Sequence, residues 1–307
     1  MGKISDSKTY AAFIGTVIIG GANFIAVSLS NKEIPPLFGA ALRFGLATLL
    51  FFLIARIWRV PLARGRSATG AAFYGLLGFG AAYALLYYAL VGLPAGIVAV
   101  IVAAVPLFTL GIAVLFSQER LSLRGVTGGV LAIIGIGILS LGTLGGELGY
   151  FYLIAAILGA VAIAASSVVA KAFPDVHPVN MNVIGMAAGT ILLIISSLVF
   201  GEHWALPREN QTFIAVGWLV ILGSVGLFQL FLYVIKRLSA SATVYAVAGM
   251  PVVTVALGAV VLNQPVTAEV LAGGALMIAA IYVGAISGKK EAPKSPPTED
   301  LAPSGGV

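Results

Sequence analysis

One charged side chain stands in the middle of a long apolar run. Arg43 lies about seven residues into the stretch from Pro36 to Ala55, which carries no other charge. If this stretch crosses a membrane, charge at that depth is costly and commonly marks the path of a solute. Arg43 is therefore a candidate gate residue or anchor for a substrate carboxylate. The structural alternative is an arginine that reaches along its aliphatic stem to the surface, or that bonds to a helix C-terminus.

Uncharged polar and aromatic side chains in other apolar runs are the next candidates. The amides of Asn23 and Gln229 are costly to bury unless paired or wetted. We expect them to face the interior, where they either line a substrate cavity or form interhelical hydrogen bonds. Tyrosine rings beside amides suit an amphiphilic solute such as an amino acid, since a ring stacks on apolar groups while its hydroxyl forms hydrogen bonds. The full predicted cavity lining is Asn23, Arg43, Tyr83, Tyr87, Ser166, Gln229 and Tyr245.

Residues for other chemistries are missing from the apolar runs. His177 and His203 lie outside them, and no Asp or Glu lies in the middle of one. Neither a catalytic base for a serine nucleophile nor a set of metal ligands is available at depth. The chain has no cysteine, which excludes disulfides and thiolate sites. We therefore predict no enzyme activity, no metal and no cofactor.

The missing acids also bear on energy coupling and on the kind of transport. Proton-coupled carriers usually keep a protonatable carboxylate at depth, so transport down the solute's own gradient is favoured over proton antiport. A channel would need a continuous polar pore, whereas each run carries one or two polar residues. A solute channel, or an importer of other metabolites such as nucleobases, is the alternative function.

The elements that carry these residues are membrane spans. Hydrophobic residues make up 60% of the chain and charged residues 9%, with a mean hydropathy of +1.08. Soluble domains carry roughly 25% charged residues. Runs near the ~20 residues that cross a bilayer must be helices, because lipid offers the backbone no hydrogen-bond partners. We predict an all-α membrane protein with ten transmembrane helices, at 10–28, 36–55, 69–90, 95–116, 124–141, 149–171, 178–200, 212–235, 240–262 and 267–287.

Basic residues orient these spans. With the N-terminus in the cytoplasm, the cytoplasmic side holds 14 of the lysines and arginines, and the outer side holds only Lys32 and Arg208. Both termini are therefore predicted to be cytoplasmic, as residues 1–9 and a disordered tail at 288–307. This asymmetry accounts for the pI near 9.6 without a nucleic-acid partner.

The chain repeats itself with a shift of 145 residues. That shift aligns Leu93–Leu141 with Leu238–Ile286 without a gap, and it also aligns Gly78 with Gly223. Each repeat, 10–141 and 149–287 around a loop at 142–148, contains five spans. Because five is odd, the second repeat is inverted relative to the first. Inverted repeats are typical of transporters, which place substrate near the midplane between the repeats.

Prolines and glycines recur in both repeats. Pro106 and Pro251 lie mid-span at equivalent positions, where each removes a backbone hydrogen bond and is expected to kink its helix. They are candidate hinge or gate residues, or static kinks of the kind that membrane helices tolerate. Glycines allow close helix contact, and a packing role is predicted for Gly125, Gly128, Gly129, Gly273 and Gly274.

These motifs resemble the drug/metabolite transporter superfamily, specifically its EamA-type ten-helix exporters, over about residues 10–287. The resemblance rests on Gly20–Phe24, Ala41–Phe44, the segment from Leu93 through Pro106 to Leu121, Gly128-Gly129, Gly135, and in the second half Pro251, Leu262–Val266 and Gly273-Gly274. Asn263-Gln264 departs from the Gly-Glu ending usual in the family, which puts any role of that acid in doubt in the second half.

The resemblance implies more than the residues alone. It implies a monomeric carrier for a small-molecule substrate in the inner membrane, similar to bacterial amino-acid exporters, including exporters of aromatic amino acids. It places spans 1, 3, 4, 6, 8 and 9 around a central cavity, with spans 5 and 10 outside. The two halves would then rock about Pro106 and Pro251 in alternating access.

Overall fold

The computed structural model describes residues 7–116, 122–141, 149–173, 176–230, 234 and 240–286, with the backbone alone at 240–245, 285 and 286. Every regular element among these residues is helical. Eight described helices are long and apolar enough to cross a membrane, and two shorter apolar helices cover 246–261 and 268–284. The predicted all-helical membrane architecture is confirmed.

The first half of the chain supplies five apolar segments. They are α1 (Ser7–Ser30), α2 (Pro36–Ile57), a segment made of α3 (Arg66–Gly75), η1 (Leu76–Ala81) and α4 (Ala82–Gly92), a segment made of α5 (Ala95–Ala103) and α6 (Val105–Leu115), and α7 (Leu123–Leu141). The second half supplies α8 (Gly149–Lys171), α9 (Pro178–Val199), α10 (Asn210–Val220) with η2 (Ile221–Gly226), α12 (Ala240–Val261), and α13 (Ala268–Ile281) with η3 (Tyr282–Ile286).

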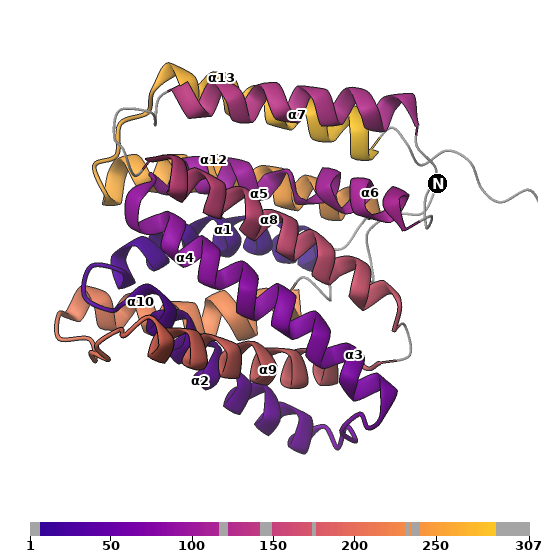
Figure 1. Ribbon diagram of the computed structural model, residues 1–307, viewed down its shortest axis with the longest axis vertical. Helices are drawn as coiled ribbons and strands as arrows, with labels where there is room; N and C mark the ends of the chain where they lie inside the picture. The colour runs from indigo at the N-terminus through magenta and orange to yellow at the C-terminus, as the bar shows by residue number, and fades with distance from the viewer. Residues whose placement is uncertain are drawn as a thin grey trace, which may run out of the picture.

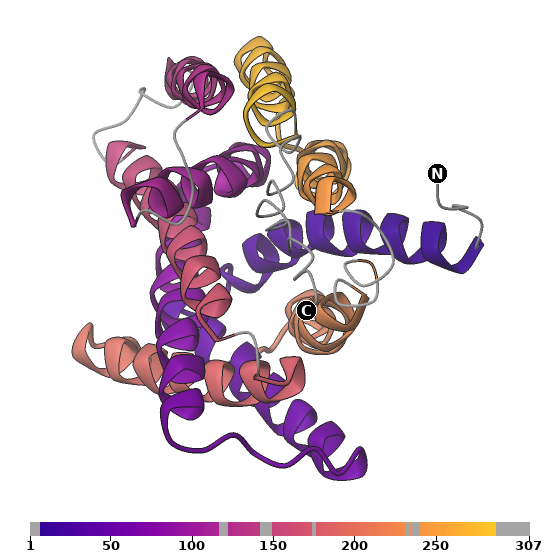
Figure 2. The ribbon, with the colours of Figure 1, turned by 90° about the vertical axis from the view of Figure 1, so that its right-hand side faces the viewer.

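The helices lie side by side in layers, with their connections at two opposite ends (Figure 1). α7 and α13 pack against each other at one edge, next to the layer of α5, α6 and α12. α1, α4 and α8 lie in the middle, and α2, α3, α9 and α10 lie at the far edge. After a turn of 90°, the α7–α13 pair again lies at one edge of the bundle (Figure 2).

Two π-helical turns occupy equivalent places in the two repeats. η1 begins at Leu76 and η2 at Ile221, and both are six residues long, so their bounds differ by the repeat shift of 145 residues. π-helical turns interrupt the regular backbone ladder and occur frequently at functional sites. The duplicated turn therefore directs attention to the residues around η1 and η2.

The glycines of the outer pair mostly support close packing, with one exception. A Cβ on Gly128 would meet the backbone of Gly284, and one on Gly273 would meet the Gly135 carbonyl oxygen at 2.9 Å. Gly125 lies against Leu110, and Gly274 lies against Val100. Gly129 departs from the prediction, because no described atom lies within 4 Å of its Cβ position. Successive residues of a helix point about 100° apart, so only one of two adjacent glycines can face α13.

The two prolines that the repeat places in register have different effects on their helices. Pro106 stands in the first turn of α6, and Ala104 separates α6 from the end of α5. Pro251 lies inside α12, which runs without interruption from Ala240 to Val261. Regular helix is thus interrupted beside Pro106 and continues through Pro251, and the equivalent kinks stay a prediction. The missing N–H of a proline is harmless in a first turn and has to be tolerated in a helix interior.

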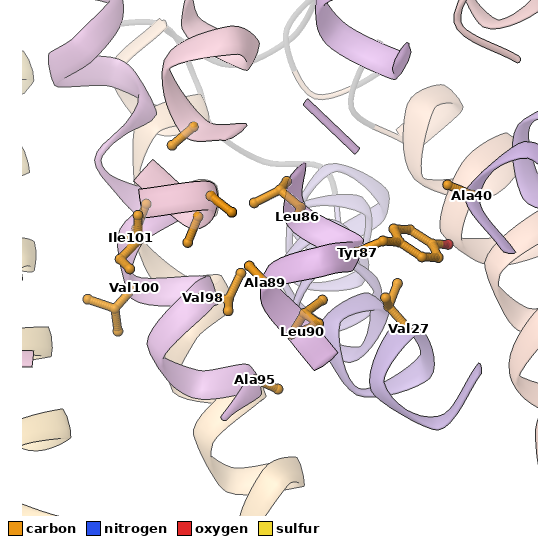
Figure 3. Packing of buried hydrophobic residues seen from close by; sticks show 14 of the residues in the cluster. Val27, Ala40, Leu86, Tyr87, Ala89, Leu90, Ala95, Val98, Val100 and Ile101 are labelled. Carbon is orange, nitrogen blue, oxygen red and sulfur yellow. The ribbon is translucent and has the colours of Figure 1, made fainter. Parts of the chain in front are cut away.

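Small and aliphatic side chains fill the core between α1, α2, α4 and α5. Figure 3 shows Leu86 and Leu90 of α4 facing Val98 of α5, with short side chains such as Ala89 between them. Tyr87 projects from α4 in another direction, past Val27 of α1 toward Ala40 of α2. Close approach through small residues is how helices associate in lipid, where no hydrophobic force drives them together. This packing places a tyrosine hydroxyl inside the bundle.

Candidate functional site

Arg43 lies fully inside the bundle. Only 1% of its surface is exposed. Its Nε donates a hydrogen bond to the Ser224 hydroxyl at 3.0 Å, and its Nη2 donates to the Gly223 carbonyl at 3.0 Å. The alternative of an arginine that reaches the surface is therefore wrong. A cation from α2 in the first repeat is instead bonded to η2 in the second repeat.

The Gly223 carbonyl accepts hydrogen bonds from side chains of two helices in the first repeat. Besides Arg43, the Asn23 amide of α1 donates to it at 3.1 Å, and the indole of Trp218 donates to the Asn23 oxygen at 3.3 Å. A Cβ on Gly223 would overlap the Asn23 amide, so Asn23 can come this close only because residue 223 is a glycine. The next residue, Ser224, donates its own hydroxyl to the Leu219 carbonyl at 2.9 Å. The irregular backbone of η2 is thus the centre of a buried polar network.

The charge of Arg43 has no counterion in the part of the chain that the structure describes. Its hydrogen-bond partners there are a hydroxyl and a carbonyl, and it forms no ion pair among those residues. Its guanidinium carbon lies 5.0 Å from the ring centroid of Phe44 and 5.2 Å from that of Tyr83. Such ring faces attract a cation. Dipoles and rings stabilise the buried charge without neutralising it.

The two rings beside this cation belong to an aromatic cluster that extends to the second repeat. Tyr83 packs edge-on against Phe44, with 4.6 Å between ring centroids, and stacks on Phe79 at 6.4 Å. Phe79 in turn packs edge-on against Phe228 of the second repeat at 5.5 Å. The same face of α4 carries Tyr87, whose side chain is completely buried and whose hydroxyl forms no hydrogen bond of good geometry with the residues that the structure describes. Of the predicted lining residues, the structure brings Asn23, Arg43, Tyr83 and Tyr87 together.

The other predicted lining residues lie elsewhere. The Ser166 hydroxyl donates to the Ile163 carbonyl of its own helix and lies 2.8 Å from the Cβ position of Gly78 in η1. The Gln229 amide nitrogen is buried without a hydrogen-bond partner in the described part of the chain. The side chain of Tyr245 is outside the described residues.

The structure also shows interactions between the repeats that sequence reasoning missed. The Glu202 carboxylate accepts hydrogen bonds from the backbone N–H groups of Leu37 at 3.0 Å and Phe38 at 2.8 Å, at the start of α2. The Gln264 side chain accepts from the N–H of Ala95 at 3.1 Å, at the start of α5. These contacts gather at the end of the bundle that carries the loops 31–35, 200–209 and 262–267, which we call the capped end (left in Figure 1).

A signal for these caps was present in the sequence. The residues before α2 and α5 are Pro35 and Pro94, and proline has no side-chain oxygen to bond the free N–H groups of a helix start. A distant acceptor must then supply the cap. Asn263, in the left-handed conformation with φ of 52°, turns the chain just before Gln264. Asparagine tolerates that conformation better than most residues.

A hollow near this end is small and mostly apolar. It lies between Pro94 and Ile97 on one side and Val255 and Val270 on the other, with Gln264 at its edge. Its lining does not include Arg43 or Asn23, so it is separate from the polar network.

Comparison with known proteins identifies the architecture. A model of a family described as the EamA-like transporter family matches residues 7–141 and, a second time, residues 150–285. The chain belongs to this family. The double match divides this EamA protein into two repeats, in agreement with the internal alignment. The EamA family lies within the drug/metabolite transporter superfamily, so the resemblance noted from the sequence is confirmed.

Curated relatives of this EamA chain are named as transporters. The "Uncharacterized inner membrane transporter YedA" of Escherichia coli (strain K12) is 33% identical over 283 residues, which cover 89% of this chain and 90% of the relative. The "Probable amino-acid metabolite efflux pump" of Salmonella typhimurium is 27% identical, with coverage of 87% and 91%. A chain titled "Crystal structure of protein" has the same fold, with a TM-score of 0.66 at 20% identity over 94% of this chain and 100% of that chain.

Proposed function

We propose that this EamA-family protein exports small amphiphilic metabolites, with amino acids as the best-matched class and aromatic ones among them. The observation that carries the proposal is the buried polar network of Arg43, Asn23 and η2. It joins the two repeats, where transporters of this kind hold substrate. The rings of Phe44 and Tyr83 beside it provide apolar faces for a side chain.

The proposed topology has ten spans, both termini in the cytoplasm and the second five-helix repeat inverted. The capped end carries Lys32 and Arg208. The opposite end of the bundle carries more basic residues, at or beyond the ends of the helices: Arg56, Arg59, Arg64, Arg66 and Lys171. The positive-inside rule then orients the capped end outward. One relative is named as an inner membrane transporter, which supports the same membrane for this chain. The proposed functional unit is a monomer with repeats at 10–141 and 149–287.

The proposed mechanism is alternating access. The repeats rock about the helix break at Pro106 and about Pro251, and so expose a central site to each side in turn. Gln229, Ser166 and Tyr245 are proposed as further lining residues that reach the solute in other positions of the cycle. The name of the Salmonella relative supports export as the direction. Transport follows the gradient of the solute, since no described acid lies beside Arg43 to carry a proton.

Counterflow in proteoliposomes tests this function. Purified protein is given labelled amino acids and nucleobases, and exchange against the unlabelled solute is followed. We expect saturable exchange of amino acids that falls at least tenfold in Tyr83→Ala and Asn23→Ala. Tyr10→Ala is the matched control, because Tyr10 is 52% exposed on the side of α1.

The outcomes separate the alternatives. Exchange of nucleobases alone would show that nucleobases, and not amino acids, are the substrate class. Flux without saturation would indicate a channel. Absence of exchange for every solute, from protein that remains monodisperse, would contradict the transport proposal.

A further inference from the structure

The Arg43 guanidinium carries more hydrogen-bonding capacity than the chain uses. It has five N–H donors, and two donor atoms form hydrogen bonds in the described part of the chain, to Ser224 and Gly223. Both acceptors are neutral. A buried cation without a paired anion is costly, and hydrogen bonds to a charged acceptor are roughly twice as strong as those to a neutral one. An anion that reached Arg43 would therefore compete well with its present partners.

The present partners of Arg43 also have other bonds. If Arg43 turned away, the Gly223 carbonyl would keep the hydrogen bond from Asn23. The Ser224 hydroxyl would keep its hydrogen bond to Leu219. Loss of Arg43 would thus leave neither group unsatisfied, and unsatisfied buried groups are what usually makes such an exchange costly. The hydrogen bonds from Arg43 to Gly223 and Ser224, which we call the α2–η2 link, can open at small cost.

A second donor lies near the guanidinium. The Tyr87 side chain is 0% exposed. The Arg43 guanidinium acts on its hydroxyl both by charge and as a hydrogen-bond donor, although no hydrogen bond of good geometry joins the hydroxyl to any described residue. The ring of Tyr87 lies one turn from that of Tyr83, with 6.5 Å between centroids, and points toward α2 (Figure 3). A phenol hydroxyl donates readily to a carboxylate oxygen. Arg43 and Tyr87 together therefore form an anion receptor built from buried side chains.

We infer that the transported solute carries a free carboxylate, which replaces Gly223 and Ser224 on Arg43 and thereby opens the α2–η2 link between the two repeats. This inference rests on the proposed function and deepens it in two respects. It restricts the substrate class to carboxylates, and it makes binding of the solute the event that frees α2 from η2. Amines that lack the carboxylate, amides and nucleobases would leave the link closed.

The fluorescence of Trp218 tests the inference without any need for transport. The Trp218 indole is bonded to Asn23, which is bonded to Gly223 of the link. Trp58→Phe and Trp204→Phe leave Trp218 as the single tryptophan, since the chain has three. Detergent-purified protein is titrated with non-aromatic amino acids, with their carboxamides and with acetate. We expect a saturable change with the acids and at least tenfold weaker binding of the matching carboxamides.

Three variants sharpen the test. Arg43→Gln is expected to lose the preference for the acid over the amide, and Arg43→Lys to keep the preference with weaker binding. Ser224→Ala is expected to bind the acids about threefold more tightly, because a competitor for Arg43 Nε is removed; a merely structural role for Ser224 would not produce tighter binding. Thr48→Ala is the matched control, since its hydroxyl bonds only to the Phe44 carbonyl of its own helix.

The results distinguish this inference from the proposed function. Counterflow in which carboxamides exchange as well as acids would overturn the inference and leave transport standing. The same holds if a folded Arg43→Gln or Arg43→Lys protein keeps the full affinity and preference of the parent. An acid-selective change in Trp218 fluorescence without counterflow of any solute would support the receptor and contradict the transport proposal. A fluorescence response to neither acid nor amide, in protein that exchanges amino acids, would show that the link stays closed.

Discussion

The π-helical turns η1 and η2 occupy equivalent positions in the two repeats, but they contact different groups. η2 is the centre of the polar network, where its Gly223 carbonyl accepts from Asn23 and Arg43. η1 is packed mainly among apolar groups, with the Ser166 hydroxyl beside its Gly78, and the Cβ position of its Gly80 lies 2.7 Å from Leu192 and 3.4 Å from the Gly189 backbone of α9. Duplication kept the irregular backbone in both halves, whereas the chemistry around it diverged.

One position shows how the divergence arose. The residue after the shared glycine is Phe79 in η1 and Ser224 in η2, again 145 residues apart. Phe79 packs against Tyr74, Tyr83 and Phe228, and Ser224 accepts a hydrogen bond from Arg43. One copy therefore holds the halves together by ring packing, and the other holds them through a polar link that a solute can exchange.

The largest expected effect is at Gly75, just before η1. A Cβ there would overlap backbone atoms of Gly185 in α9, which cannot move aside as a side chain can. Gly75→Ala should destabilise the protein by about 3 kcal/mol or more, by overpacking. Heating followed by size-exclusion chromatography gives the midpoint of unfolding. The equivalent residue before η2 is Val220, and Val220→Ala, which only removes methyl groups, should cost about 1–2 kcal/mol. A Gly75→Ala protein as stable as its parent would show that α3 and α9 do not need this contact.

The second prediction compares equivalent residues of η1 and η2. Phe79→Ala should cost about 3 kcal/mol, since it empties a buried ring site. Ser224→Ala should cost about 1 kcal/mol, the net value of a typical hydrogen bond. The same unfolding assay measures both. If the serine variant were the less stable of the two, η2 rather than η1 would be the main structural contact between the repeats.

The smallest effect is a pH dependence at the start of α10. A hydrogen bond from the Thr212 hydroxyl lowers the pKa of Glu33 below its ordinary value of 4.5, and the N–H groups of Glu209 and Arg208 act in the same direction. Because the pKa is lowered in the folded state, this contribution to stability is present above pH 4.5 and is lost as the pH falls through the lowered value. The unfolding midpoint, compared between pH 7 and pH 3, should fall slightly less in Glu33→Gln than in the parent. Equal falls would show that the Glu33 contact adds nothing measurable.

The sequence predicted the features that depend on local pattern. Apolar runs identified the helices. The internal repeat predicted that residues 145 positions apart have equivalent places, and η1 and η2 begin 145 residues apart. The cost of burying polar groups drew attention to Arg43 and Asn23, which both bond to the Gly223 carbonyl. Contacts between distant segments were beyond reach, because nothing in the run around Arg43 indicates whether it meets a carbonyl 180 residues away or the lipid surface. The same limit explains Gly129 and Ser166, whose roles depend on the direction in which each helix is rotated.

The distant caps on α2 and α5 have a consequence for biogenesis. Glu202, which caps α2, is 165 residues downstream of Leu37, and Gln264 is 169 residues downstream of Ala95. At roughly 5–20 residues per second of synthesis, the starts of these early helices wait on the order of ten seconds or more for their acceptors to leave the ribosome. During that wait only water can bond their free N–H groups. Loops of the second repeat therefore complete the starts of helices that were translated with the first repeat.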